Sequence, residues 1–188
     1  KNRSGKPAKV LVTGATGYIG GRLIRELLAH DYKVRVLVRD PKRITDYPWQ
    51  KNVEVVVGDA TDPAVLAQAL EGIDLAYYLL HALMVDKNFE LMERELAEVF
   101  GKVAKEKNVS RIIYLGGMIS NDLELSPHMS AREETGEILR GSGVPTIELR
   151  AGVVIGSGSA SFEMLRHLTE RLPFMVTPKW LLNKIQPI

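Results

Sequence analysis

The sequence has no cysteine, and this absence excludes disulfides, thiolate metal sites, iron–sulfur clusters and thiol nucleophiles. It also lacks a long apolar run, because the longest one, residues 75–85, is interrupted by His81 and is shorter than the ~20 residues of a membrane span. The sequence also has little net charge: 25 Lys and Arg residues nearly balance 23 Asp and Glu residues, which leaves a net charge of +2. A general nucleic-acid binder needs a stronger basic excess. We therefore expect a cytoplasmic protein with no membrane span and no nucleic-acid partner.

The composition that is present belongs to an ordinary globular chain. Hydrophobic residues make up 45% and charged residues 26% of the 188 positions, which excludes the disordered, collagenous and fibrous classes. This length suits one domain, and we expect it to span residues 1–188. The chain does not begin with methionine, and residues 184–188 resemble the beginning of a strand, so we expect a fragment that is truncated at its C-terminus.

Strand and helix patterns alternate along the chain. Runs rich in Val, Ile, Leu and Tyr predict strands at residues 9–13, 34–39, 53–57, 75–80, 111–115 and 146–155. Apolar residues at helical spacing predict a helix that ends near His30 and others at about 63–71, 89–107, 130–140 and 161–172. This alternation predicts a three-layer α/β protein, in which helices cover both faces of a doubly wound parallel sheet with the strand order 3-2-1-4-5-6.

Three glycines stand between the first predicted strand and the first predicted helix. Gly14, Gly17 and Gly20 lie in the segment VTGATGYIG, residues 12–20. A dinucleotide diphosphate needs backbone amides that approach it closely, a helix N-terminus that faces it, and no side chain in between. Gly14 and Gly17 meet the first need, and Gly20 lets the helix pack on the strand. The alternative is a glycine-rich turn that only reverses the chain.

Residues 13–20 resemble the fingerprint of extended and atypical short-chain dehydrogenases/reductases, whose glycine spacing differs from the G-x-G-x-x-G of other dehydrogenases. The likeness covers nearly the whole chain and is closest to the NmrA-like branch, whose members are also described as nucleoside-diphosphate-sugar epimerase-like or NAD(P)H-binding proteins. Residues 37–43, 58–62 and 76–81 carry similar strings. The resemblance implies a Rossmann fold with NADP or NAD as cofactor. The cofactor-binding residues that it implies are Gly14, Thr16, Gly17, Tyr18, Ile19, Gly20, Arg39, Asp59, Ala60, Leu79 and His81.

The end of the second predicted strand bears on the choice between NAD and NADP. A carboxylate there binds the ribose hydroxyls of NAD, whereas an arginine binds the 2′-phosphate of NADP through charge-assisted hydrogen bonds. Aligned with the family, Val38 takes the acidic position and Arg39 follows it, so the resemblance favours NADP. Lys42 and Arg43 add positive charge nearby, and Asp40 keeps NAD open. The alternative to any binding role is a solvated loop with balanced charges.

Two further strand ends carry residues that the resemblance places at the cofactor. Asp59 matches the family's acid that receives the adenine amino group, and Ala60 adds a backbone contact. The alternative for Asp59 is a turn or a helix cap, although Asp62 is better placed to cap. Leu79 and His81 end the fourth strand, at the edge where open α/β sheets bind ligands. His81 either faces the cofactor or is a hydrogen-bonded structural histidine.

The catalytic set of active short-chain dehydrogenases is a tyrosine that donates a proton, a lysine four residues later and a serine after the fifth strand, and this sequence departs from all three. Glycines occupy the serine position at residues 116–117. The tyrosine and lysine fall on Met129 and Glu133 or, shifted by one residue, on His128 and Arg132. An imidazole can donate a proton and a guanidinium can hold ribose, so we expect the shifted pair to be catalytic. The alternative is two surface side chains in the first turn of a helix.

The remaining motifs are weaker. The four histidines are too scattered to form a metal site, and we expect residues 156–161 to form a ligand-facing loop and a helix cap. We predict an NADPH-dependent reductase or epimerase-like oxidoreductase that acts on a carbonyl or sugar-like small molecule. The alternative, favoured by the missing serine, tyrosine and lysine, is a non-enzymatic NAD(P)-binding sensor or scaffold.

Overall fold

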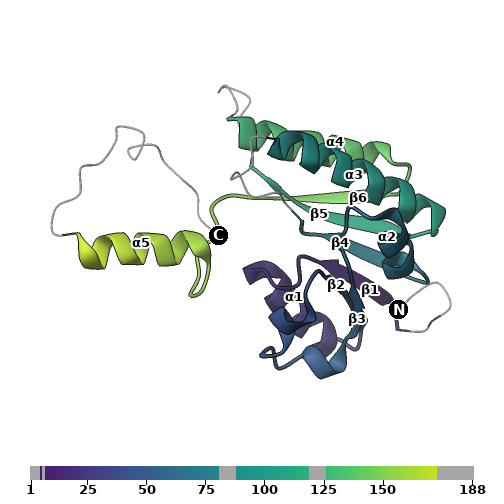
Figure 1. Ribbon diagram of the computed structural model, residues 1–188, viewed down its shortest axis with the longest axis horizontal. Helices are drawn as coiled ribbons and strands as arrows, with labels where there is room; N and C mark the ends of the chain where they lie inside the picture. Colours follow the sequence, from purple (N-terminus) through teal and green to yellow (C-terminus); the bar gives the residue numbers. More distant parts are fainter. Residues whose placement is uncertain (1–4, 6, 81–87, 119–125, 173–188) are drawn as a thin grey trace. The chain divides into compact units, whose positions relative to one another are not determined.

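Figure 1 shows the computed structural model of the protein, which describes residues 5, 7–80, 88–118 and 126–172. The chain divides into two compact units, residues 1–149 and 150–188. Among the described residues, the first unit contains most of the helices and strands, and the second contains one helix and the end of the last strand. A single domain over residues 1–188 stays a prediction.

A six-stranded sheet with the order β3-β2-β1-β4-β5-β6 organises the fold and confirms the predicted topology. The strands are β1 (Lys9–Thr13), β2 (Lys33–Val38), β3 (Glu54–Val57), β4 (Leu75–Tyr78), β5 (Arg111–Gly117) and β6 (Thr146–Ala151). The pairings of β1 with β2 and β4, of β2 with β3 and of β4 with β5 are parallel. Val12 of β1 lies opposite Val36 of β2 and Tyr77 of β4, so these three strands end at one edge of the sheet.

Capping and stop residues in the sequence set the ends of several helices. They are α1 (Tyr18–Ala29), α2 (Pro63–Leu70), α3 (Phe89–Glu106), α4 (Pro127–Gly141) and α5 (Ala160–Arg171). The Asp62 side chain caps α2 by accepting a 2.8 Å hydrogen bond from the Ala64 amide, as the sequence predicts. After α3, Asn108 adopts a φ of 56°, a left-handed conformation that asparagine tolerates and that stops the helix.

Several boundaries differ from those predicted, and among them β4 ends at Tyr78 rather than at residue 80. Helix α4 begins at Pro127 rather than near residue 130, because the Ser126 side chain accepts a 3.3 Å hydrogen bond from the Met129 amide and caps it earlier. Strand β5 continues to Gly117, two residues beyond its predicted end. Strand β6 ends at Ala151 rather than at residue 155. The residues that follow β6 are apolar, but they do not extend the strand.

The connection from β2 to β3 contains two short 3₁₀ helices that the sequence analysis does not predict. They are η1 (Pro41–Ile44) and η2 (Gln50–Asn52). Asp40 caps η1, because its Oδ1 accepts a 2.9 Å hydrogen bond from the Lys42 amide. Short 3₁₀ turns lack the repeating apolar spacing by which longer helices are recognised.

The sheet carries a hydrophobic core on each face. Leu11 of β1 packs into the core beneath α2, α3 and α4, whereas its neighbours Val10 and Val12 pack into the core beneath α1. In the first core, the rings of Tyr78 and Phe100 lie 5.0 Å apart between centroids in an edge-to-face arrangement. Figure 1 shows α2, α3 and α4 together along one side of the sheet and α1 on the other. This is the predicted three-layer α/β/α architecture of a Rossmann fold.

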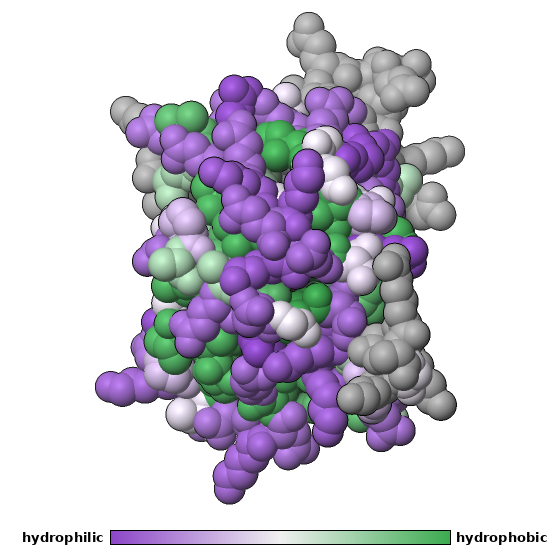
Figure 2. Space-filling view, turned by 90° about the vertical axis from the view of Figure 1, so that its right-hand side faces the viewer, coloured by the Kyte–Doolittle hydropathy of each residue, from purple (hydrophilic) through white to green (hydrophobic). Residues whose placement is uncertain are grey.

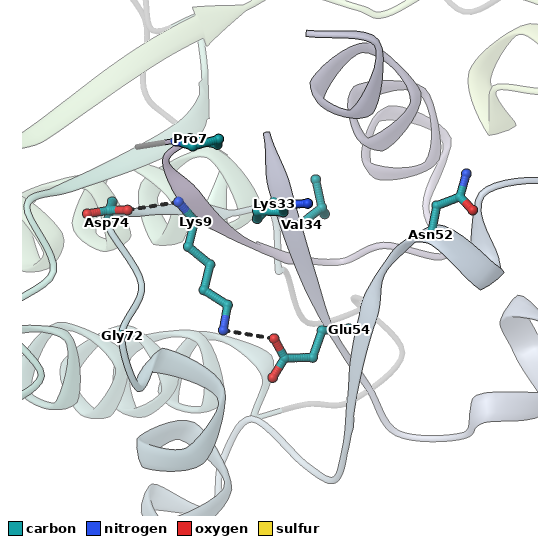
Figure 3. Close-up of a pocket in the computed structure, with 8 residues that line it drawn as sticks. All are labelled: Pro7, Lys9, Lys33, Val34, Asn52, Glu54, Gly72 and Asp74. Carbon is teal, nitrogen blue, oxygen red and sulfur yellow. Dashed lines mark hydrogen bonds and ion pairs between the residues drawn. The ribbon is translucent and has the colours of Figure 1, made fainter. Parts of the chain in front are cut away.

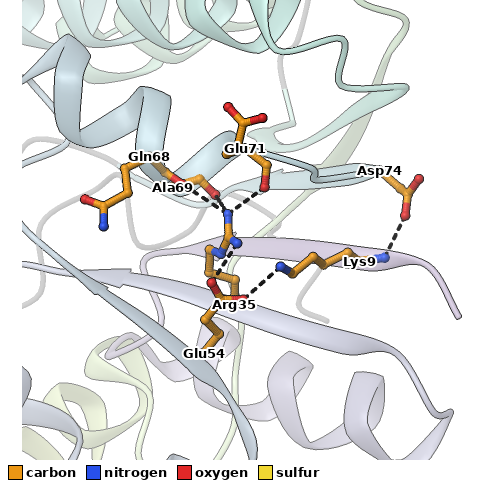
Figure 4. Close-up of polar contacts among 7 residues, drawn as sticks. All are labelled: Lys9, Arg35, Glu54, Gln68, Ala69, Glu71 and Asp74. Atoms are coloured by element: carbon orange, nitrogen blue, oxygen red, sulfur yellow. Dashed lines mark hydrogen bonds and ion pairs between the residues drawn. The ribbon is translucent and has the colours of Figure 1, made fainter.

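A buried arginine joins α2 to two strands (Figure 4). Arg35 of β2 is only 6% exposed, and its Nη1 donates hydrogen bonds to the carbonyl oxygens of Gln68 at 3.1 Å, Ala69 at 2.8 Å and Glu71 at 2.8 Å. Its Nη2 pairs with Glu54 of β3 at 2.6 Å. Since the last carbonyls of a helix have no partners within the helix, Arg35 satisfies the C-terminal end of α2.

The second unit is organised by the start of α5. Ser159 caps this helix by accepting a 3.3 Å hydrogen bond from the Phe162 amide, and its hydroxyl also donates to the Val154 carbonyl at 3.3 Å. The helix cap expected within residues 156–161 is therefore confirmed. Several apolar side chains of α5 are exposed, and they are Met164, Leu165 and Leu168.

Hydrophilic side chains cover most of the face drawn in Figure 2, with smaller hydrophobic areas between them. Arg166 pairs with Glu163 at 2.8 Å on α5. Further pairs of opposite charge join the C-cap residues of α2 and α3, and join α3 to α4. Such pairing agrees with the small net charge of +2. Of the helices in the described ranges, none is both long and apolar enough to cross a membrane.

Candidate functional site

The glycine-rich turn joins β1 to α1 at the carboxyl edge of the sheet, and two of its glycines are fixed by packing. Gly14 has a φ of 70°, and a Cβ there would stand 2.6 Å from the Leu79 carbonyl oxygen. A Cβ on Gly20 would stand 2.3 Å from the Gly14 carbonyl oxygen. The Gly17 amide donates a 3.0 Å hydrogen bond to the same oxygen. Side chains at positions 14 and 20 would therefore push the turn away from β4 and α1 away from the turn.

Thr13 holds the strand ends beside this turn. Its buried hydroxyl donates a 2.8 Å hydrogen bond to the Tyr77 carbonyl and accepts a 3.2 Å hydrogen bond from the Leu79 amide. The hydroxyl thus continues the pairing of β1 with β4 past the last residue of β4. Thr13 belongs to the glycine-rich motif, but the spacing of the motif predicts no role for it, because its partners are more than sixty residues away.

The N-terminus of α1 is a suitable place for an anion. Gly17 is its N-cap and, having no side chain, offers no capping hydrogen bond, and the first turn contains no acidic residue. The first amides of a helix have no partners within the helix and carry the positive end of its dipole. Tyr18 and Ile19 supply two of these amides, and the Arg22 guanidinium lies over the Tyr18 ring at 3.9 Å. A diphosphate fits at this end of α1, since the turn before the helix has no side chain at Gly14 or Gly17.

The ends of β2 and β3 bring charged side chains to the same edge. Arg39 is exposed directly after β2, while the Asp40 carboxylate is engaged as the cap of η1. Asp59 accepts hydrogen bonds from the Thr61 amide and hydroxyl, both at 2.9 Å. The pKa of Asp59 is lowered chiefly by the Thr61 amide, against the effect of burial, and the positive charge of Arg39 lowers this pKa further. Asp59 is therefore an ionised carboxylate with Arg39 nearby.

The remaining cofactor-binding candidates lie next to these residues. The turn role that the sequence analysis names as the alternative for Asp59 is present in its bonds to Thr61, and its role toward adenine stays a prediction. Ala60 is 9% exposed, and Leu79 is half-buried at the end of β4. His81 lies outside the described residues.

The positions that correspond to the family's serine and tyrosine lie against each other. A Cβ on Gly117 would stand 2.6 Å from Cε of Met129, and a Cβ on Gly116 would stand 2.6 Å from Oε1 of Glu148. The first contact joins the end of β5 to the first turn of α4. Neither Gly117 nor Met129 has a group that can donate a proton to a substrate. The expected departure from the family's catalytic set therefore has a direct counterpart in the packing.

The shifted pair, His128 and Arg132, also lies where α4 meets the end of β5. Both side chains are half-buried, so neither is a fully exposed surface residue. Arg132 donates a hydrogen bond to the Leu115 carbonyl, and its guanidinium carbon lies 5.6 Å from the centre of the Tyr114 ring. The Nδ1 atom of His128 is buried and has no hydrogen-bond partner among the described residues. The pair keeps one unsatisfied imidazole nitrogen and one guanidinium at the carboxyl edge.

Tyr114 contacts Arg132 of this pair, and its hydroxyl has a structural partner. Its hydroxyl donates a 2.9 Å hydrogen bond to the Arg132 carbonyl. Burial, opposed by the charge of Arg132, raises the pKa of Tyr114 to about 12. A phenol with so high a pKa remains protonated near neutral pH and cannot serve as an easily ionised acid.

A cavity of about 380 Å³ opens at the amino ends of β1, β2 and β3, the opposite edge of the sheet (Figure 3). Several of its polar groups are engaged within the protein: the Lys9 side chain pairs with Glu54 at 2.9 Å, and the Asp74 carboxylate accepts a 2.8 Å hydrogen bond from the Lys9 backbone amide. Ligands of open α/β sheets bind at the carboxyl edge, so we place the functional site at the glycine-rich turn and not in this cavity.

Known proteins resemble this chain over most of its length. Residues 14–155 match the protein family described as NAD(P)H-binding. Ceramide reductase of Caulobacter vibrioides is 25% identical over 171 residues, which cover 88% of this chain and 52% of that protein. The (4-alkanoyl-5-oxo-2,5-dihydrofuran-3-yl)methyl phosphate reductase of Streptomyces griseus is 32% identical over 137 residues, covering 72% of this chain and 44% of that protein. The chain thus spans about half the length of these curated relatives.

A solved structure adds a likeness in three dimensions. The triphenylmethane reductase of Citrobacter sp., complexed with NADP(H), is 25% identical to this chain and has a TM-score of 0.70. The likeness covers 86% of this chain and 55% of the reductase.

Proposed function

Because the chain belongs to the NAD(P)H-binding family, we propose that it binds the cofactor at the carboxyl edge, with the diphosphate on residues 14–20. The observation that carries this proposal is that no side chain caps the N-terminus of α1. The turn that precedes this helix has no room for side chains at Gly14 and Gly20. Tyr18 and Ile19 offer amides there, and Thr16 completes the turn. On the adenine side we assign Asp59 and Ala60, and beside the turn we assign Leu79. His81, which lies outside the described residues, is assigned from the family resemblance alone.

We further propose that NADP is preferred to NAD. The carboxylate that could bind ribose hydroxyls, Asp40, already accepts the Lys42 amide as the cap of η1. Arg39 is exposed at the end of β2, and a guanidinium there can form forked, charge-assisted bonds with a 2′-phosphate. Arg39 thus has the chemistry for NADP, and Asp40 is occupied elsewhere.

The reaction we propose is reduction of a carbonyl or of a sugar-like small molecule. The reduced nicotinamide supplies the hydride when the cofactor is bound. His128 donates the proton that the carbonyl oxygen requires, and the Arg132 guanidinium holds the ribose of the cofactor. The reductases among the relatives support this class of reaction, and the half-buried position of the pair supports the assignment of these two residues.

The second candidate function is a non-enzymatic sensor or scaffold that binds the dinucleotide without turnover. The contact of Met129 with Gly117, where a tyrosine and a serine would be needed, favours it. The two functions differ in whether bound NADPH is consumed.

Turnover with a panel of carbonyl compounds separates the two functions. We expect steady loss of NADPH absorbance with at least one compound and a fall of about 100-fold in kcat for His128→Ala, since general acid catalysis contributes on that order. His30→Ala, at the C-terminal end of α1, is the matched control and should leave kcat unchanged. Binding without turnover would support the sensor, and unchanged turnover in His128→Ala would exclude His128 alone.

A further inference from the structure

A tyrosine outside every recognised motif contacts the glycine-rich turn. Tyr47 lies between η1 and η2 in the connection from β2 to β3, and its hydroxyl donates a 3.1 Å hydrogen bond to the Thr16 carbonyl. Its ring lies against the first turn of α1, since a Cβ on Gly21 would stand 3.2 Å from Cε1 of Tyr47. The Tyr47 side chain therefore contacts both the glycine-rich turn and the first turn of α1, which together form the proposed diphosphate site.

The ring of Tyr47 is itself held in place. It lies 4.8 Å from the Trp49 ring between centroids, and Trp49 is 3% exposed in the core beneath α1. The Tyr47 amide donates a 3.1 Å hydrogen bond to the Ile44 carbonyl, and its own carbonyl accepts a 3.0 Å hydrogen bond from Gln50. Because its ring packs against the core, the Tyr47 side chain can hold the turn that it contacts in a fixed position.

The bond to Thr16 matters because of the peptide unit that it fixes. The Thr16 carbonyl and the Gly17 amide belong to one planar group. Tyr47 binds the oxygen of this group, and the Gly14 carbonyl binds its N–H at 3.0 Å. Both ends of the peptide that leads into α1 are therefore held, which sets the direction of the free amides that follow it.

We propose that Tyr47 is a positioning residue for the cofactor diphosphate and acts through the peptide between Thr16 and Gly17. This inference rests on the proposed dinucleotide site and adds to it a residue from a distant part of the sequence. Because NADPH and NADH share the diphosphate, Tyr47 contributes equally to both, unlike Arg39, which contacts only the 2′-phosphate in our proposal.

The test is Tyr47→Phe, which keeps the ring against Gly21 and Trp49 and removes only the hydroxyl. By calorimetric titration we expect the Kd of NADPH and of NADH to rise by the same factor, about 3- to 10-fold, as for the loss of one hydrogen bond. Adenosine 2′-phosphate, which has no diphosphate, should bind both proteins equally. Tyr32→Phe, which removes a hydroxyl near the C-terminal end of α1, is the control and should leave every Kd unchanged.

Three results would overturn the inference. They are an unchanged Kd for NADPH in Tyr47→Phe, a loss that extends equally to adenosine 2′-phosphate, and a changed ratio of NADPH to NADH affinity. Failure of the wild-type protein to bind either dinucleotide would instead contradict the proposed function, so the two failures are distinguishable.

Discussion

The residues of the site differ in the reason why each position needs its particular amino acid. Gly20 is fixed by sterics, because any Cβ there would meet the Gly14 carbonyl oxygen at 2.3 Å. The motif spacing identifies this glycine, and the structure supplies the packing reason for it. Arg39 has no such steric reason, since it is exposed at the end of β2. Its identity matters only if a ligand contacts it, which makes Arg39 the more informative position to change.

Arg39→Ala tests the preference for NADP. A charge-assisted hydrogen bond contributes about 1.5–3 kcal/mol, and each 1.4 kcal/mol changes affinity about tenfold. We therefore expect the Kd of NADPH to rise by about 10- to 100-fold, while the Kd of NADH stays the same. Parallel calorimetric titrations with the two dinucleotides measure this difference.

The control is Arg25→Ala, which removes the same charge from an exposed position on α1. It should leave both affinities nearly unchanged. An equal loss of NADH and NADPH affinity in Arg39→Ala would show that Arg39 does not distinguish them by the 2′-phosphate.

At the scale of elements, Arg35 joins β2, β3 and α2. Its guanidinium binds three carbonyls at the end of α2 and the Glu54 carboxylate of β3. We expect Arg35→Met to lower the free energy of unfolding by about 2–4 kcal/mol at neutral pH, because it leaves buried carbonyls without donors. Denaturant unfolding measures this loss, and Lys33→Met, at an exposed position of the same strand, should change stability by less than about 0.5 kcal/mol.

The same ion pair gives the stability loss a pH dependence. The hydrogen bond from Arg35 is the largest cause that lowers the pKa of Glu54 below its usual 4.5. A carboxylate whose pKa is lowered by folding adds stability above its unfolded pKa and loses it as the pH falls through the folded value. The difference in stability between wild type and Arg35→Met should therefore narrow below pH 4.5. A constant difference down to acid pH would contradict the role given to Glu54.

The elements that could be predicted are those with a repeating pattern or a strong cap. Strand β1 and the start of α2 agree with the sequence analysis because Val and Leu runs, Asp62 and Pro63 are local signals. The two 3₁₀ helices and the contact of Tyr47 with Thr16 could not be predicted, since neither depends on a periodic spacing. Contacts between residues distant in sequence, such as Gly117 with Met129, require the folded backbone.

At the scale of the whole molecule, the alternation of strands and helices was sufficient to predict the sheet order. Right-handed crossovers leave few topologies for such a chain, and the observed order β3-β2-β1-β4-β5-β6 is the one expected. The order places the ends of β1, β2 and β4 side by side and so assembles the proposed site from distant segments. The proposals about the substrate depend on relatives of which this chain covers about half the length.

The most direct measurement of the central claim is an amide NMR titration of the ¹⁵N-labelled protein with NADPH. We predict that the largest chemical-shift changes fall on the amides of residues 14–20, because they approach the diphosphate, and that Arg39 and Asp59 shift with them. Shifts centred on the cavity around Lys9 and Asp74, or none at saturating NADPH, would contradict the account.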